Sequence, residues 1–111
     1  KPVEVVIDMN GESYSTLSVR TFVSKWEDMY APLGLEAYVS EDGQNFEPLA
    51  IEEYPIEEET VPDGIKKYDL DFPETSARYL KVVVRTVPAL PQWSERTGKP
   101  AYLFLDEIKV E

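Results

Sequence analysis

Apolar side chains fall at every second position through much of this chain. The clearest case is Arg78–Val87, where Leu80, Val82 and Val84 form one apolar face and longer mixed side chains alternate with them. A period of two with this much valine is typical of a β-strand with one face in a core. Such a strand needs partners on both edges and a second layer over its apolar face. We therefore expect Arg78–Val87 to be central in a layered β structure.

The same alternation predicts further short strands between turn signals. They are Val3–Met9, Leu17–Val23, Leu35–Ser40, Phe46–Ile51, Lys66–Phe72, Ala101–Leu105 and Asp106–Val110. Asn10-Gly11 is the strongest short turn signal, and Glu41–Gln44 places Asp and Gly where turns favour them. Pro48 indicates an edge strand or a bulge. Strands at this spacing, with no convincing helix, predict an all-β antiparallel sandwich or barrel.

Three long connections interrupt the strand pattern, and each contains proline and glycine. They are Ser24–Gly34, Glu52–Gly64 and Pro88–Pro100. Aromatic residues within the strand patterns are expected in the core: Phe22, Tyr38, Phe46, Tyr68, Phe72, Tyr79 and Phe104. Trp26, Tyr30 and Trp93 lie instead in the connections. Their rings could cap the sandwich, pack on a neighbouring domain, or lie against the C–H face of a sugar.

The amino-acid composition excludes several classes of function. The 111 residues suit one domain, which we take as 1–111, and Lys1-Pro2 leading straight into a strand pattern suggests a module excised from a larger protein. With no cysteine and no histidine, thiol nucleophiles, imidazole bases and Cys/His zinc sites are excluded. The carboxylate pair Asp106–Glu107 should point to opposite faces of a strand, so we expect no catalysis.

The charge balance excludes other partners. The chain carries 22 acidic and 11 basic residues, a net charge of −11, which disfavours nucleic acid as a partner. No apolar run is long enough to span a membrane. Between Glu41 and Asp63 there are many acids and no Lys or Arg. This segment could be a solvated loop, a divalent cation site or an interface with a basic partner.

The hypothesis for a binding site rests on the aromatic residues of the connections. A flat ring beside a few polar groups is the composition of a carbohydrate site. The predicted contact residues are Trp93, Trp26, Tyr30, Arg96 and Glu27. A shared site requires that the connections containing them meet at one end of the sandwich.

Three stretches resemble discoidin-like modules, also called F5/8 type C domains, which have the galactose-binding jelly-roll β-sandwich fold. They are Pro32–Phe46 with its Ser40, Asp42, Gly43 and Phe46, then Ala77–Val82, and the closing Phe104–Val110. Together with Pro91-Gln92-Trp93 and Gly98–Phe104, the pattern is similar to the C-terminal modules of β-N-acetylhexosaminidases (chitobiases) of Bacteroides-type bacteria. The resemblance covers residues 3–110.

This resemblance implies a function and a cellular location. It implies a noncatalytic, carbohydrate-binding accessory module of a secreted glycoside hydrolase, periplasmic or extracellular, and monomeric when isolated. The alternative is a structural domain that docks on the catalytic domain and binds no sugar. In such modules a glutamate like Glu107 completes a structural calcium site, so the resemblance implies Glu107 as a metal ligand. The extra first strand and loop that begin such modules are absent here, and Ser94 follows Trp93 where the hexosaminidase modules commonly have histidine.

Overall fold

The computed structural model describes residues 2–24, 30–54, 63–86 and 104–111, with Phe104 and Asp106 described by their backbone alone. Its seven strands are β1 (Val3–Asp8), β2 (Tyr14–Val23), β3 (Gly34–Ser40), β4 (Glu47–Glu53), β5 (Gly64–Thr75), β6 (Tyr79–Arg85) and β7 (Phe104–Val110). The described segments are strands, turns and irregular backbone, so they include no helix that could cross a membrane.

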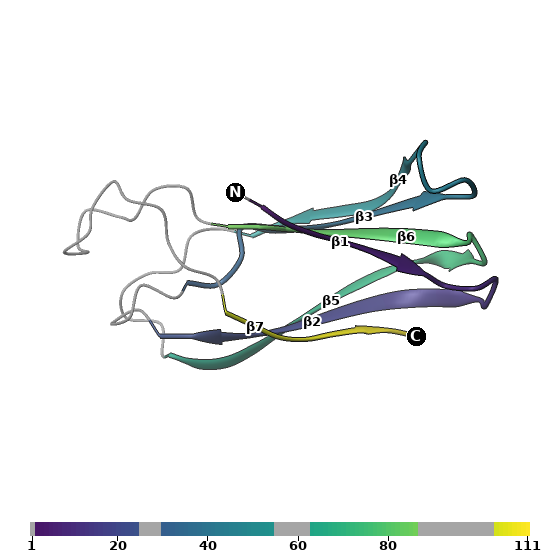
Figure 1. Ribbon diagram of the computed structural model, residues 1–111. Coiled ribbons are helices and arrows are strands. Elements are labelled where there is room, and N and C mark those ends of the chain that lie inside the picture. Colours follow the sequence, from purple (N-terminus) through teal and green to yellow (C-terminus); the bar gives the residue numbers. More distant parts are fainter. Residues whose placement is uncertain (1, 25–29, 55–62, 87–103) are drawn as a thin grey trace.

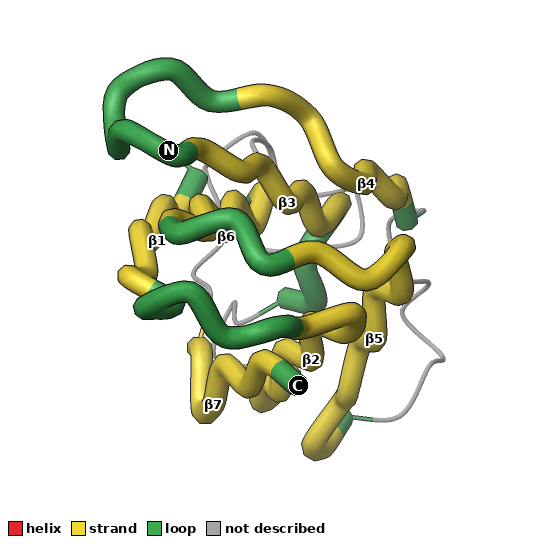
Figure 2. Tube along the Cα trace, turned by 90° about the vertical axis from the view of Figure 1, so that its right-hand side faces the viewer, coloured by secondary structure: helices red, strands yellow, loops and turns green. Residues whose placement is uncertain are grey.

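The strands form two antiparallel sheets that lie face to face (Figures 1 and 2). The first sheet, called sheet A here, has the order β1-β6-β3-β4, and the second, sheet B, has the order β5-β2-β7. Neighbouring strands in each sheet are mostly distant in sequence, so the chain crosses repeatedly between the layers. The predicted all-β antiparallel sandwich is confirmed.

Strand β6 has the central place that its sequence predicted. It pairs with β1 on one edge and with β3 on the other, so that Val82 stands opposite both Val5 and Ala37. Leu80, Val82 and Val84 are each 0% exposed. Fully burying a side chain of this kind stabilises a protein by about 1.5–3 kcal/mol relative to leaving it in water. The alternation of β6 thus provides the centre of the hydrophobic core.

The core draws side chains from both sheets. Its buried members are Tyr14, Leu17, Val19, Leu35, Ala37, Leu70, Phe72, Leu80, Val82 and Val84. The rings of Tyr14 and Phe72 meet edge to face with centroids 6.1 Å apart, and the Tyr14 hydroxyl donates to the carbonyl of Ala77 at 2.9 Å. Tyr14 precedes the predicted second strand, which in fact begins three residues earlier than its apolar alternation shows.

Strand parity corrects part of the predicted aromatic core. Leu17, Val19 and Val23 face inward on β2, so Phe22 must face outward, and it is 37% exposed. Tyr38 lies on the outer face of sheet A in register with Lys81. The Lys81 ammonium lies 5.1 Å from the Tyr38 ring centroid and 4.8 Å from that of Phe46. Phe72 is in the core as predicted, but core positions for Phe22, Tyr38 and Phe46 are wrong.

The predicted turns form, though one of them joins different strands from those expected of its type. Asn10 and Gly11 both have positive φ, 57° and 80°, as Asn-Gly turns require. Such a turn usually closes a hairpin, but here it leads from β1 in sheet A to β2 in sheet B. Pro48 lies on the edge strand β4 and next to a bulge, since Tyr38 pairs with Pro48 while Ala37 pairs with Ala50. Both readings of that proline are confirmed.

Candidate functional site

Six strand ends meet at one end of the sandwich, which we call the loop end. In sheet B, Val23 stands opposite Gly64, and Phe22 opposite Phe104. In sheet A, Gly34 stands between Glu53 and Arg85. The connections 24–33, 54–63 and 86–103 therefore leave and re-enter the strands at the same end (Figure 1). The condition for a shared site, that these connections start from one end of the sandwich, is met by the strand ends.

Arg85 links the sheet A strands at this end. Its Nη2 donates to Oε1 of Glu53 at 3.0 Å. Its Nε lies 3.0 Å from Oε2 of Glu36, but the N–H does not meet hydrogen-bond geometry, so this contact is an ion pair. Glu36 also accepts from the Tyr38 hydroxyl through its other oxygen, at 2.5 Å. One basic side chain is therefore held by two carboxylates from two different strands.

Backbone bonds extend this arrangement past the strands. The carbonyl of Arg85 accepts from the Leu33 N–H at 2.8 Å, and the Leu33 carbonyl accepts from the Tyr54 N–H at 2.8 Å. The Tyr54 ring packs on that of Tyr68 with centroids 4.7 Å apart. Burial raises the pKa of Tyr54 to about 12. The described residues nearest the connections are thus tied into both sheets.

Tyr30 does not have the exposure that a ligand contact needs. It is 2% exposed, and the neighbouring Ala31 and Pro32 are also buried. A ring with so little accessible surface cannot lie against a sugar, so the prediction of Tyr30 as a contact residue is corrected: its ring packs inside the protein. Position in a loop and proximity to charge did not reveal this burial, because neither property says which other residues pack on the ring.

The other predicted contact residues lie outside the described residues. Trp26 and Glu27 fall within 25–29, and Trp93 and Arg96 fall within 87–103. The structure places only the strand ends that flank them, Val23 and Gly34 for the first pair and Arg85 and Phe104 for the second. Their roles stay predictions.

Glu107 is exposed on β7, directly across from Arg20 on β2. Calcium is coordinated by several oxygen ligands at once. Among the described residues no three acidic side chains gather as a metal site would require. The role of Glu107 as a metal ligand stays a prediction.

A bulge changes the argument about the neighbouring carboxylate. Arg20 pairs with Glu107 and Thr21 with Leu105, so Asp106 is the extra residue of a bulge in β7. Strict alternation, on which the separation of Asp106 and Glu107 was predicted, is interrupted at a bulge. The side chain of Asp106 is outside the described residues, whereas the lack of histidine and cysteine in the chain is independent of this geometry.

The opposite end, called the turn end here, is closed by short turns. A hollow of about 390 Å³ opens there, lined by Val39, Ser40, Glu41, Asp42, Asn45, Glu47 and Ala77. Asp42 is committed to the turn itself: it accepts from the backbone N–H groups of Asn45 and Gln44, each at 2.8 Å, and from the Ser40 hydroxyl. These bonds, the one from Asn45 first, hold the pKa of Asp42 well below its usual range. Asp42 therefore serves the turn.

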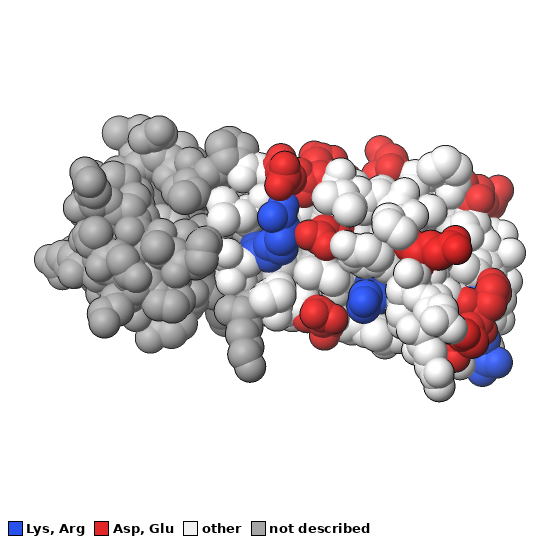
Figure 3. Space-filling view, turned by 90° about the horizontal axis from the view of Figure 1, so that it is seen from above, with Lys and Arg blue, Asp and Glu red and all other residues white. Residues whose placement is uncertain are grey.

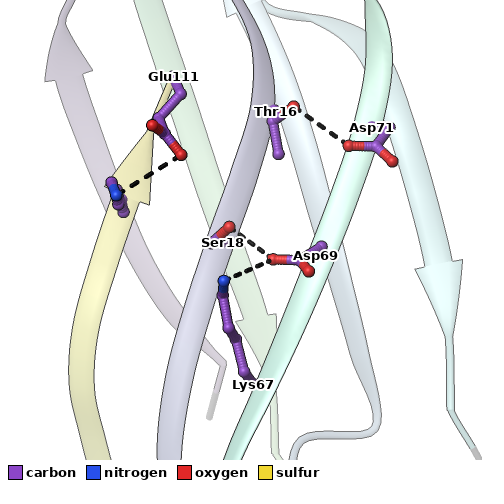
Figure 4. Close-up of polar contacts among 7 residues, drawn as sticks. Thr16, Ser18, Lys67, Asp69, Asp71 and Glu111 are labelled. Carbon is purple, nitrogen blue, oxygen red and sulfur yellow. Dashed lines mark hydrogen bonds and ion pairs between the residues drawn. The ribbon is translucent and has the colours of Figure 1, made fainter.

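Hydrogen bonds and an ion pair between polar side chains extend over much of the outer face of sheet B (Figure 4). The Thr16 hydroxyl donates to Asp71 at 3.1 Å, and the Ser18 hydroxyl donates to Asp69 at 2.6 Å. Lys67 lies 3.8 Å from the same Asp69 carboxylate. Toward the loop end this face changes character, because Phe22 and Ile65, which are opposite each other on β2 and β5, are 37% and 64% exposed.

Comparison with solved structures gives further support for the fold. No protein-family model and no curated protein matches the sequence. CBM32-3 from a family 31 glycoside hydrolase of Clostridium perfringens matches with a TM-score of 0.51 and 15% identity over 96% of this chain and 68% of that one. This likeness confirms the β-sandwich fold that the discoidin-like resemblance implied.

Two further matches have TM-scores below 0.5. CpGH89CBM32-5 from Clostridium perfringens, solved in complex with GalNAc-β-1,3-galactose, has a TM-score of 0.49 and 20% identity over 96% of this chain and 67% of that one. The C-terminal domain of a chitobiase from Bacteroides fragilis has a TM-score of 0.41 and 20% identity over 100% of this chain and 66% of that one. The chain thus spans about two thirds of each of the three.

Arg85, Glu36 and Glu53 are the residues at this end that sequence reasoning missed. Period-two alternation assigns Arg85, the residue after Val84, to the outer face of the central strand and does not give its partner. The two glutamates lie 17 residues apart on different strands, and alternation assigns a face without naming the partner across it. The one available signal was Gly34 at the start of a strand, since a glycine there often marks a close approach of another group.

Proposed function

We propose that this chain is a noncatalytic carbohydrate-binding module that serves as an accessory to a secreted glycoside hydrolase of the β-N-acetylhexosaminidase (chitobiase) type. The observation that carries the proposal is the convergence of strand ends: the connections with Trp26 and Trp93 both depart from the loop end. Two indole rings presented from one end would form the apolar wall of a sugar site. The sandwich fold is one that carbohydrate-binding modules of glycoside hydrolases use.

The proposed contacts are Trp26 and Trp93, with Glu27 and Arg96 bonding to the sugar hydroxyls. Tyr30 is left out because its ring is buried. Holding a glycan close to a linked active site would raise the effective substrate concentration there. The absence of histidine and cysteine from the chain favours this role over catalysis. A module of this kind would act outside the cytoplasm, where its glycan is found.

Titration of the isolated chain with oligosaccharides of N-acetylglucosamine and of galactose tests the proposal. The expected result is a saturable change in tryptophan fluorescence with a Kd of about 1 mM or tighter, lost in Trp26→Ala and Trp93→Ala. Phe46→Ala is the matched control, since it removes an aromatic ring next to β4 at the turn end and should leave the affinity unchanged. No fluorescence change with any of these sugars would reject the proposal.

A second candidate is a structural domain that docks on the catalytic domain and binds no sugar. It is favoured by the outward pair Phe22 and Ile65 beside the loop end, since adjacent exposed apolar side chains can be part of a contact surface. Deleting the module would then lower the thermal stability of the parent enzyme and leave its KM for soluble substrates unchanged. A Kd for oligosaccharides on the isolated chain, lost in the tryptophan variants, would decide against it.

A further inference from the structure

Arg85 reaches over an intervening strand. Sheet A has the order β6-β3-β4, so the Glu53 that Arg85 binds is on the next strand but one. Between them lies Gly34, the first residue of β3, which is opposite both residues in the register. The guanidinium therefore crosses β3 at Gly34 to reach β4.

The glycine leaves the space that this crossing needs. A Cβ at position 34 would lie 2.8 Å from Nε of Arg85 and 2.9 Å from its Cζ. Because the guanidinium is the end of a flexible side chain, an added Cβ would displace the guanidinium and leave the backbone in place. The contact of Arg85 with Glu53 therefore depends on glycine at position 34, because the guanidinium occupies the space that a side chain there would fill.

The two carboxylates that hold Arg85 differ in exposure. The side chain of Glu36 is 15% exposed and that of Glu53 is 77% exposed, against 36% for Arg85. The contact with Glu36 is therefore the better shielded of the two, since exposed pairs of long side chains contribute little. A charge held by two carboxylates has fewer alternative positions. Figure 3, seen from the side of β3 and β4, shows that basic side chains are few among the acidic ones on this face. Arg85 is the basic side chain that lies between the carboxylates of Glu36 and Glu53.

We propose that Arg85 is a positioning residue for the loop end: by joining the ends of β3, β4 and β6 it holds in register the strand ends from which the three long connections depart. For its consequence in sugar binding the inference rests on the proposed function. Binding groups lose affinity when their supports allow them to move by a fraction of an ångström. Arg85 would thus raise the affinity of the site for sugar without contacting the sugar.

Two variants disrupt the contacts of Arg85 with Glu36 and Glu53 in different ways. Arg85→Gln removes the charge, while Gly34→Ala keeps every charge and displaces the guanidinium. The matched control is Arg78→Gln, which removes the arginine just before β6 whose Nη2 lies 3.3 Å from Asp8 at the turn end, with both side chains about half exposed. Arg85→Lys asks whether the charge alone restores the arrangement, since lysine lacks the two-pronged geometry.

The first readout needs no sugar. In proton–nitrogen spectra of the full chain, Arg85→Gln and Gly34→Ala should both shift the Leu33 and Tyr54 amide resonances and the two indole N–H resonances, and Arg78→Gln should shift none of these. The unfolding transition should stay cooperative in all three. The inference is overturned if Arg85→Gln leaves these resonances where they are in the wild-type chain, or if Arg78→Gln moves them equally.

The second readout is affinity for the N-acetylglucosamine or galactose oligosaccharide that the wild-type chain binds. Arg85→Gln and Gly34→Ala should each weaken it about tenfold, or about 1.4 kcal/mol, with Arg85→Lys in between and Arg78→Gln unchanged. Wild-type affinity in Arg85→Gln would overturn the inference. If the wild-type chain binds no sugar, the proposed function fails, and the resonance shifts still decide the role of Arg85.

Discussion

The two ends of the sandwich are closed by different means. At the turn end the connections are short and contain local hydrogen bonds, as when Asp42 accepts bonds from Ser40, Gln44 and Asn45. Contacts between distant residues, such as that of Arg78 with Asp8, lie beside them. At the loop end the described contacts join distant segments, as when Arg85 binds Glu53, 32 residues away in sequence. A local turn can form wherever its own residues allow, but the loop end exists only once β3, β4 and β6 are assembled.

This difference between the two ends bears on which of them has groups available to bind a ligand. Turns that satisfy their own hydrogen bonds leave few groups for a ligand, and Asp42 shows this. Long connections leave the sheet without local closure, and such segments often carry binding residues on a rigid scaffold. The turn end thus serves the fold, and we place the proposed function at the loop end.

The largest effect is expected from the core that both ends share. Leu80→Ala removes a fully buried side chain of β6 and should lower the free energy of unfolding by about 2–5 kcal/mol. Urea denaturation followed by circular dichroism measures it. Val6→Ala, on β1 of the same sheet and 53% exposed, should change it by less than about 0.5 kcal/mol. Equal losses in the two variants would contradict the described core.

A smaller effect is expected at a single turn. Gly43 has φ of 77°, and a Cβ there would touch the Tyr79 ring at 3.4 Å. Gly43→Ala should cost about 1–2 kcal/mol. Gly11→Ala, with φ of 80° and nothing within 4 Å of the added Cβ, isolates the backbone cost. Hydrogen exchange should quicken at residues 41–46 in Gly43→Ala and remain slow at Leu33; faster exchange at Leu33 would show that the two ends are coupled.

The contact of Lys81 with two aromatic rings should contribute less to the free energy of unfolding than the Gly43 turn does. Its ammonium lies about 5 Å from the centroids of both Tyr38 and Phe46, so Lys81→Met should cost about 0.5–1 kcal/mol. Lys67→Met is the control, because the ammonium of Lys67 pairs with Asp69 at 3.8 Å on an exposed face. Thermal denaturation compares the two. An unchanged midpoint in Lys81→Met would mean that the rings hold their places without the cation.

The smallest effect is expected from the titration of Asp42, which is exposed to solvent. Its pKa is lower in the folded chain than the ordinary value of about 3.9. The resulting stabilisation is complete above that ordinary pKa and is lost as the pH falls below it toward the folded pKa. The melting temperature of the wild-type chain should therefore fall more steeply below about pH 4 than that of Asp42→Asn. Parallel curves for the two proteins would remove Asp42 from this role.

Much of the fold could be predicted because its signals are local. Alternation in Leu80, Val82 and Val84 indicated a central strand, and β6 has two neighbours with those side chains at 0% exposure. Pro48 indicated an edge or a bulge, and both are found. The candidate site was less predictable. Tyr30 was expected at the surface and is buried, because the burial of a residue in a connection depends on contacts that strand alternation does not predict.

The sequence by itself determined which side chains share a face and where the chain turns. Period-two alternation and residues such as Asn10, Gly43 and Asp42 act on their immediate neighbours, so their effect needs no knowledge of the rest of the chain. Only the tertiary structure decided which strands are adjacent, that Asn10-Gly11 joins two sheets, and that Arg85 crosses Gly34 to reach Glu53. Those outcomes depend on the packing of segments far apart in sequence, and alternation assigns a side chain to a face but does not select its partner.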